Sequence, residues 1–192
     1  MSISAEEQQD IRSKSAKPML YLGIVSMCMI FAGLTSAYIV SSGSSTAWVA
    51  FELPTMFYVS TLVIICSSLC MLFAHRSAKN DNMSGVKIGV LMTLILGISF
   101  IFCQYKAFGE LVANKLFMVS STNSAPQYLY FIVGAHLAHL LGGIIMLIYV
   151  CIKSFKQLYH SKNLLGLQLS SIYWHFLDLL WVYLFLFMYF AH

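Results

Sequence analysis

Near its carboxyl end the chain places a histidine and a carboxylate three residues apart within an apolar, aromatic stretch, residues 173–185. Residues three apart share one face of a helix, so His175 and Asp178 can interact. A bare carboxylate at the middle of a membrane costs roughly 2.5–3.5 kcal/mol, so Asp178 needs a partner or a proton. We expect His175 to be that partner.

This pair allows two interpretations. Ionisable residues inside a membrane often mark a proton relay or a position beside a cofactor. The alternative is a polar clamp that fixes the last helix against its neighbours or against another subunit. The surrounding aromatic residues could add hydrogen bonds or form an interfacial belt; they are Tyr173, Trp174, Trp181 and Tyr183. We favour the clamp, because the chain offers no set of metal-ligating side chains around the pair.

A second pair of histidines, His136 and His139, also shares one helix face. The small residues around them allow close helix approach; these are Gly134, Ala135, Ala138, Gly142 and Gly143. Haem ligation usually needs one axial histidine on each of two facing helices. With His175 as a third candidate, a b-type haem-binding membrane anchor is one hypothesis. Packing and hydrogen bonding between helices is the interpretation that we favour.

The elements that position these residues follow from composition. The 192 residues are 59% hydrophobic and only 9% charged, whereas soluble domains carry about 25% charged residues. Five apolar runs lie at about 19–42, 55–75, 88–108, 127–152 and 164–191. Each is long enough to span a bilayer, which takes about 20 residues. Lipid cannot satisfy open backbone groups, so we expect an all-α integral membrane bundle of five transmembrane helices.

The first 17 residues are polar and mixed in charge. We treat them as a separate N-terminal segment, either a short surface helix or disordered, and residues 18–192 as a single transmembrane domain. Pro18 is expected at the start of the first helix, where its missing N–H costs nothing. The first apolar run is too long for a cleavable signal peptide.

The basic residues predict the orientation. Only Lys106 and Lys115 fall on the C-terminal side of the membrane. The other nine of the eleven fall on the N-terminal side, namely Arg12, Lys14, Lys17, Arg76, Lys79, Lys87, Lys153, Lys156 and Lys162. The N-terminus is therefore expected inside and the C-terminus outside. We expect Lys17, His75 and Arg76 to reach lipid headgroups. Basic residues this few and scattered do not suit a nucleic-acid surface.

Small polar residues recur on the second run, as Ser60 and Thr61 and then, seven residues later, as Ser67 and Ser68. This spacing places them on one face of a helix. Small and hydroxyl-bearing residues are typical of contacts between membrane helices. We interpret them as a packing stripe rather than as a transport path.

Together these motifs resemble subunit III of the haem-copper oxidases (cytochrome c oxidase). Residues 173–181 resemble that family's Y-W-H-F-V-D-x-x-W run in the last helix. Residues 134–143 are similar to its G-x-H-x-x-H-V-x-x-G, and residues 96–104, ending at Gln104, to its L-G-x-x-F-x-x-x-Q. The likeness extends from about Lys17 to the end of the chain. It is to the five-helix form, which lacks the first two helices of the seven-helix version.

Two positions depart from the family pattern. Met27 stands where the family usually has a glutamate in the first of these helices, and Ala107 where it has one in the third. Glu110 lies one turn beyond the second position. A mechanism that depends on the first of these glutamates is therefore not expected here.

The resemblance implies an accessory, non-redox subunit of a proton-pumping terminal oxidase that reduces dioxygen to water in an aerobic respiratory chain. In the family, haem and copper reside in subunits I and II, and subunit III packs against subunit I, holds phospholipid and supports proton uptake. This implies a multi-pass protein of the bacterial plasma membrane with no catalytic residue of its own. Structural and assembly roles then fall to Tyr173, Trp174, His175, Asp178, Trp181, His136, His139 and Gln104. The equivalent subunit of a quinol oxidase or of a nitric oxide reductase is the alternative within the family.

Overall fold

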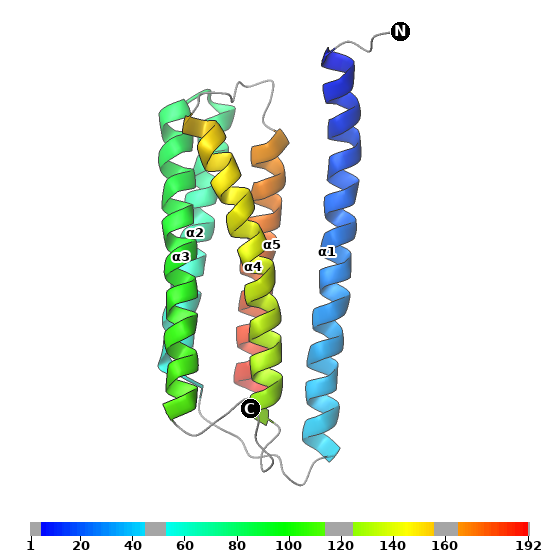
Figure 1. The fold of residues 1–192 in the computed structure, drawn as a ribbon, viewed down its shortest axis with the longest axis vertical. Helices are drawn as coiled ribbons and strands as arrows, with labels where there is room; N and C mark the ends of the chain where they lie inside the picture. The colour runs from blue at the N-terminus through cyan, green and yellow to red at the C-terminus, as the bar shows by residue number, and fades with distance from the viewer. Residues whose placement is uncertain (1–4, 45–52, 114–124, 156–164, 192) are drawn as a thin grey trace.

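The computed structural model describes residues 5–44, 53–113, 125–155 and 165–191, and these form five helices (Figure 1). The helices are α1 (Ala5–Ser44), α2 (Thr55–Lys79), α3 (Met83–Ala113), α4 (Ala125–Phe155) and α5 (Leu165–Phe190). Each is long and apolar enough to cross a membrane. The predicted all-α membrane bundle of five helices is confirmed. Helices α1 to α4 extend beyond the predicted apolar runs, because a helix can continue past the hydrocarbon core of the membrane.

Helix α1 corrects one prediction. It begins at Ala5, and Pro18 lies inside it rather than at its start. A proline within a helix forfeits one backbone hydrogen bond, yet the preceding residues include alanine, glutamate and glutamine, which favour helix. The polar N-terminal segment and the first span therefore share one continuous helix.

Helices α2 to α5 pack side by side, whereas α1 contacts only α4 and α5 (Figure 1). Successive helices run in opposite directions, so α1, α3 and α5 begin where α2 and α4 end. We call this end of the bundle the N-side face. Five of the described basic residues lie toward it, namely Lys17, Arg76, Lys79, Lys87 and Lys153. Lys115, Lys156 and Lys162 lie outside the described residues, and the assignment of the N-side to the inside of the cell stays a prediction.

The tightest pair of helices is α2 and α3. A Cβ atom added at Gly89 would lie 2.7 Å from the Ala74 Cβ, so the two backbones approach as closely as glycine allows. The turn between the helices contains Asp81 at φ 53°, an angle that few residues other than glycine adopt. The Asn82 side chain then accepts a hydrogen bond from the Gly85 N–H at 3.1 Å and caps α3.

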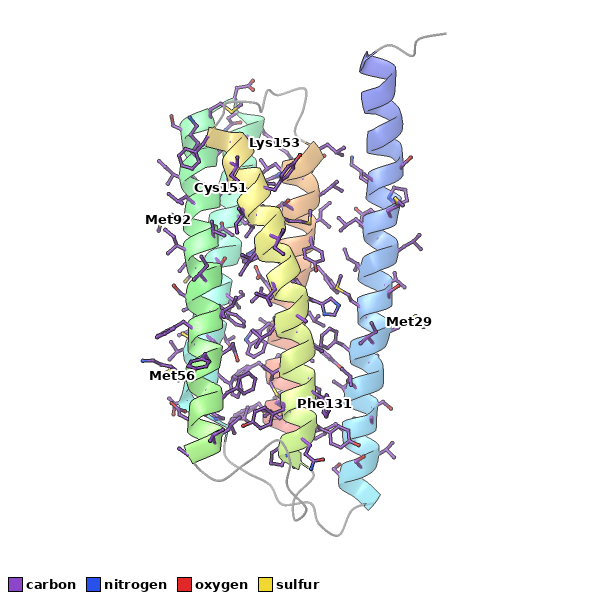
Figure 2. The ribbon with its side chains drawn as sticks, viewed as in Figure 1. Met29, Met56, Met92, Phe131, Cys151 and Lys153 are labelled. Carbon is purple, nitrogen blue, oxygen red and sulfur yellow. The ribbon has the colours of Figure 1, made fainter. Side chains whose placement is uncertain are left out.

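One large core joins α2, α3, α4 and α5, and a smaller one joins α1 to α4 and α5. From residue 15 to residue 44 of α1, the buried side chains are Phe31, Thr35 and Tyr38, and none is buried between residues 15 and 30. The outer faces carry exposed apolar side chains, as contact with lipid requires. Met29 on α1 and Phe131 on α4 are examples (Figure 2).

Candidate functional site

Two tryptophans of α5, seven residues apart, connect this helix to the rest of the bundle. Trp174 is fully buried, and its Nε1–H donates a hydrogen bond to Ser67 Oγ on α2 at 3.1 Å. Its ring lies so close to Gly97 on α3 that a Cβ there would be 2.7 Å from Trp174 Cη2. A Cβ at Gly143 on α4 would be 3.3 Å from Cζ3 of the same ring. Trp174 therefore contacts α2, α3 and α4 at once.

Trp181 repeats this arrangement two turns further along α5. Its Nε1–H donates to Thr61 Oγ1 on α2 at 3.1 Å. Its ring centroid lies 5.8 Å from that of Phe57 on α2, 5.0 Å from Phe100 on α3 and 5.1 Å from His136 on α4. The spacing of seven keeps both indoles on the same face of α5, so that face holds the four-helix core in register.

The hydroxyl stripe of α2 supplies the hydrogen-bond acceptors. Ser60 Oγ accepts from Gln104 Nε2 on α3 at 2.9 Å, and Ser67 Oγ donates to the Thr93 carbonyl at 3.3 Å. Thr61 and Ser67 also accept from the two indoles of α5. The fourth member, Ser68, contacts His175. The prediction of a packing stripe is confirmed. Gln104 of α3, which is fully buried, bonds to this stripe.

The expected pairing of His175 with Asp178 was wrong. His175 Nδ1 instead shares a 2.6 Å hydrogen bond with Ser68 Oγ on α2. Ser68 also faces the Asp178 carboxyl. Neither carboxyl oxygen, nor His175 Nε2, has a hydrogen-bond partner among the described residues, although Asp178 is only 5% exposed. Helical spacing places two side chains on one face, but their directions depend on the helix opposite, and that helix offers a serine.

His136 occupies the point where four helices meet. It is completely buried, and its imidazole lies 6.4 Å from the Phe31 ring of α1, 6.1 Å from Phe100 of α3 and 5.1 Å from Trp181 of α5. Neither ring nitrogen has a hydrogen-bond partner within the described ranges. His139 Nδ1 lies 2.8 Å from the Ala135 carbonyl of its own helix. The shared face of the two histidines is thus a packing face toward α1.

These surroundings do not fit the haem-anchor hypothesis. The imidazole of His136 is enclosed by aromatic rings, that of His139 contacts its own helix, and that of His175 contacts α2. The three candidate ligands therefore have three different environments. In the part of the chain that the structure describes, no three His, Cys, Asp or Glu side chains are grouped so that they could hold a metal ion.

Only some of the small residues of α4 lie close to another helix. Gly143 lies against α5, but a Cβ at Gly134 would meet nothing within 4 Å.

Lys17 and Arg76 are exposed near the N-side face, as headgroup contact requires. His75 is only partly exposed, its Nδ1 is buried without a partner, and it is close enough to His175 to interact electrostatically.

Sequence reasoning missed the contacts that attach α1. Thr35 Oγ1 lies 3.3 Å from Tyr183 Oη on α5, and Ser41 Oγ lies 2.6 Å from Tyr128 Oη on α4. The Tyr38 ring lies edge-on to Phe187 at 5.4 Å. The available signal was the gathering of hydroxyl-bearing residues in the second half of the first apolar run, at Thr35, Ser36, Tyr38, Ser41 and Ser42.

Comparison with known proteins gives this arrangement its context. The family model described as cytochrome c oxidase subunit III matches residues 8–192. The chain belongs to the cytochrome c oxidase subunit III family. It is 28% identical over 162 residues to cytochrome c oxidase subunit 3 of Bacillus sp. (strain PS3), covering 82% of this chain and 76% of that protein.

Two further subunit III proteins show the range of the family. Cytochrome bo(3) ubiquinol oxidase subunit 3 of Buchnera aphidicola subsp. Schizaphis graminum (strain Sg) is 29% identical over 174 residues, 88% of this chain and 90% of that protein. Cytochrome c oxidase subunit 3 of Mycosarcoma maydis is 33% identical over 145 residues, 72% of this chain but 48% of that protein. The names include both cytochrome c and ubiquinol oxidases.

The two positions that depart from the subunit III pattern are packed with apolar atoms in the structure. Ala107 is fully buried in the main core, and Met27 packs against the edge of that core. Glu110 is partly exposed near the end of α3. A carboxylate at position 107 would lie in the core of this bundle, whereas that of Glu110 lies at its partly exposed edge. Glu110 therefore does not take the place of a glutamate at position 107.

Proposed function

We propose that this chain is the accessory, non-redox subunit III of a proton-pumping terminal oxidase in a bacterial plasma membrane. The match of residues 8–192 to the family carries the proposal. The packing supports it, because the indoles and histidines of the family motifs are engaged in joining helices. Haem and copper belong, on this proposal, to partner subunits I and II, and the role of this chain is to stabilise subunit I.

The proposal includes phospholipid held where this chain meets subunit I. Between positions 15 and 30, α1 has no buried residue, and Lys17 is exposed toward the N-side face. An apolar helix surface with a cation at the membrane boundary suits an acyl chain and an anionic headgroup. Mass spectrometry of lipids retained by the purified complex tests this, with Lys17→Gln expected to lower the retained anionic lipid.

Co-purification tests the main proposal. An affinity tag on this chain should recover a large haem-bearing subunit from the membrane. His175→Ala and Asp178→Ala should lower the amount of that subunit recovered, while the haem spectrum of the recovered complex stays unchanged. Leu179→Ala is the matched control, because Leu179 adjoins Asp178 on α5 but is 69% exposed. An Asp178→Ala complex with normal yield and normal lifetime during turnover would overturn the stabilising role.

A quinol oxidase is the second candidate. The ubiquinol oxidase subunit of Buchnera matches this chain over 90% of its own length. The two oxidases differ in the electron donor, which binds to partner subunits on this proposal. Supplying the purified complex with ubiquinol in one assay and with reduced cytochrome c in another, and following oxygen consumption, distinguishes them.

A further inference from the structure

A row of polar side chains leads from the N-side face to the middle of the bundle along the α2–α5 contact. His75 lies near the N-side end of α2, two turns from Ser68 on the same side of that helix, and its charge would act on His175 of α5. His175 Nδ1 is 2.6 Å from Ser68 Oγ, and Ser68 faces Asp178 near the centre of α5. The row is separate from the indole contacts, since the hydroxyls of Ser67 and Thr61 accept those bonds.

Unlike the α2 stripe, this row contains polar atoms that have no hydrogen-bond partner. His75 Nδ1, His175 Nε2 and both Asp178 oxygens are buried and have no partner among the described side chains and backbone. Buried polar atoms without partners are rare in proteins and call for an explanation. These atoms are enclosed by this chain itself, so a neighbouring subunit placed against its surface does not reach them.

Histidines and carboxylates in sequence inside a membrane are the groups from which proton relays are built. Proton transfer needs donor and acceptor within hydrogen-bond reach, directly or through one water. The unpaired atoms of the row are the atoms that bridging water molecules would bind. We propose that Asp178 is a proton-binding group that exchanges its proton with water at the N-side face through His75, His175 and Ser68.

The transfer balances without any other reactant. A proton from N-side water binds His75, which is partly exposed. It passes to the unpartnered Nε2 of His175 through a bridging water molecule. The imidazole then releases the proton on Nδ1 to Ser68 Oγ while the Ser68 hydroxyl gives its own proton to the Asp178 carboxylate. His175 and Ser68 return to their neutral forms, and Asp178 becomes a carboxylic acid. The reverse sequence returns the proton to the same face.

Infrared spectroscopy of the intact complex in lipid, during exchange from H₂O into D₂O, tests this inference. The spectrum of the parent minus that of Asp178→Asn isolates the C=O stretching band of the protonated Asp178 side chain. That band should shift to lower frequency as deuterium arrives. The rate of the shift reports access to Asp178 and does not depend on which oxidase this chain serves.

The relay variants are Ser68→Ala and His75→Phe. A positioned proton-transfer group typically speeds its transfer by roughly 100-fold or more, so each variant should slow the shift on that scale. A purely structural role predicts the opposite, because looser packing admits D₂O faster. Ser67→Ala is the matched control; it removes the adjacent hydroxyl and loosens the Trp174 contact, and should not slow the shift.

Two results would overturn the inference. One is the absence of any Asp178-dependent C=O band in the parent, which means that the residue holds no proton. The other is a shift in Ser68→Ala and His75→Phe that is as fast as in the parent or faster.

Discussion

Gly97 provides the sharpest test of how α5 is held. A Cβ at this position would lie 2.7 Å from Cη2 and 3.0 Å from Cζ2 of Trp174. The indole has little freedom to retreat, because it is fully buried, its Nε1–H is bonded to Ser67, and Gly143 lies against the ring. Gly97→Ala therefore forces either the ring or α3 to move.

The magnitude follows from the cost of adding one methyl group to a filled core. Overpacking of this kind typically destabilises by about 1–3 kcal/mol. For a chain of this size each kcal/mol lowers the thermal midpoint by about 2–4 °C, so a decrease of about 2–12 °C is expected. The helix preference for alanine over glycine, about 1 kcal/mol, opposes this loss and favours the lower end.

The assay is the thermal midpoint of the detergent-solubilised complex, followed by size-exclusion chromatography of heated samples. Gly134→Ala is the matched control, since a Cβ there meets nothing within 4 Å and the midpoint should stay or rise. Adding Trp174→Phe to Gly97→Ala removes Cη2 and Cζ2, and should recover part of the loss despite the missing bond to Ser67. Equal midpoints for Gly97→Ala and Gly134→Ala would refute the close packing of α3 on α5.

Three further predictions concern other contacts. Gln104→Ala should destabilise by about 1–3 kcal/mol, whereas Gln104→Met with Ser60→Ala should be nearly neutral by the same midpoint assay, because both members of a buried bond are then apolar. Asp81→Gly should raise the midpoint, since Asp81 has φ 53° and the left-handed conformation costs roughly 1–2 kcal/mol in residues with a Cβ; a lower midpoint would mean that the Asp81 side chain stabilises the turn. Phe31→Ala should loosen α1 by about 3–5 kcal/mol of lost packing, seen as faster protease cleavage between α1 and α2, whereas Met29→Ala, on the exposed face, should not.

Most of the fold followed from composition and the length of the apolar runs. Five helices were predictable because a membrane leaves the backbone few alternatives. The error at Pro18 arose because proline is read as a helix start, although it is tolerated inside a helix when its neighbours favour continuation. The packing role of the stripe on α2 was also predictable, because hydroxyls and small residues recurred with a helical period.

The candidate site was only partly predictable. The motif around His175 identified the helix whose two indoles pack against α2, α3 and α4, whereas the assembly role of its residues stays a prediction. The partner of His175 was not predictable, because Ser68 lies 107 positions away along the chain and reaches it only when α2 packs antiparallel to α5. The environment of His136 likewise needed three other helices to be in place.

The sequence by itself determined that this protein has five helices long and apolar enough to cross a membrane, that α5 carries its longest family motif, and that the chain is a subunit III family member. These properties depend on local composition and on runs of neighbouring residues. Only the tertiary structure decided that Ser68 forms a hydrogen bond with His175 while the Asp178 carboxyl has none among the described residues. It also decided that Gly97 and Gly143 lie against the indole of Trp174. Such contacts depend on the relative rotation and depth of whole helices, which no single segment of sequence specifies.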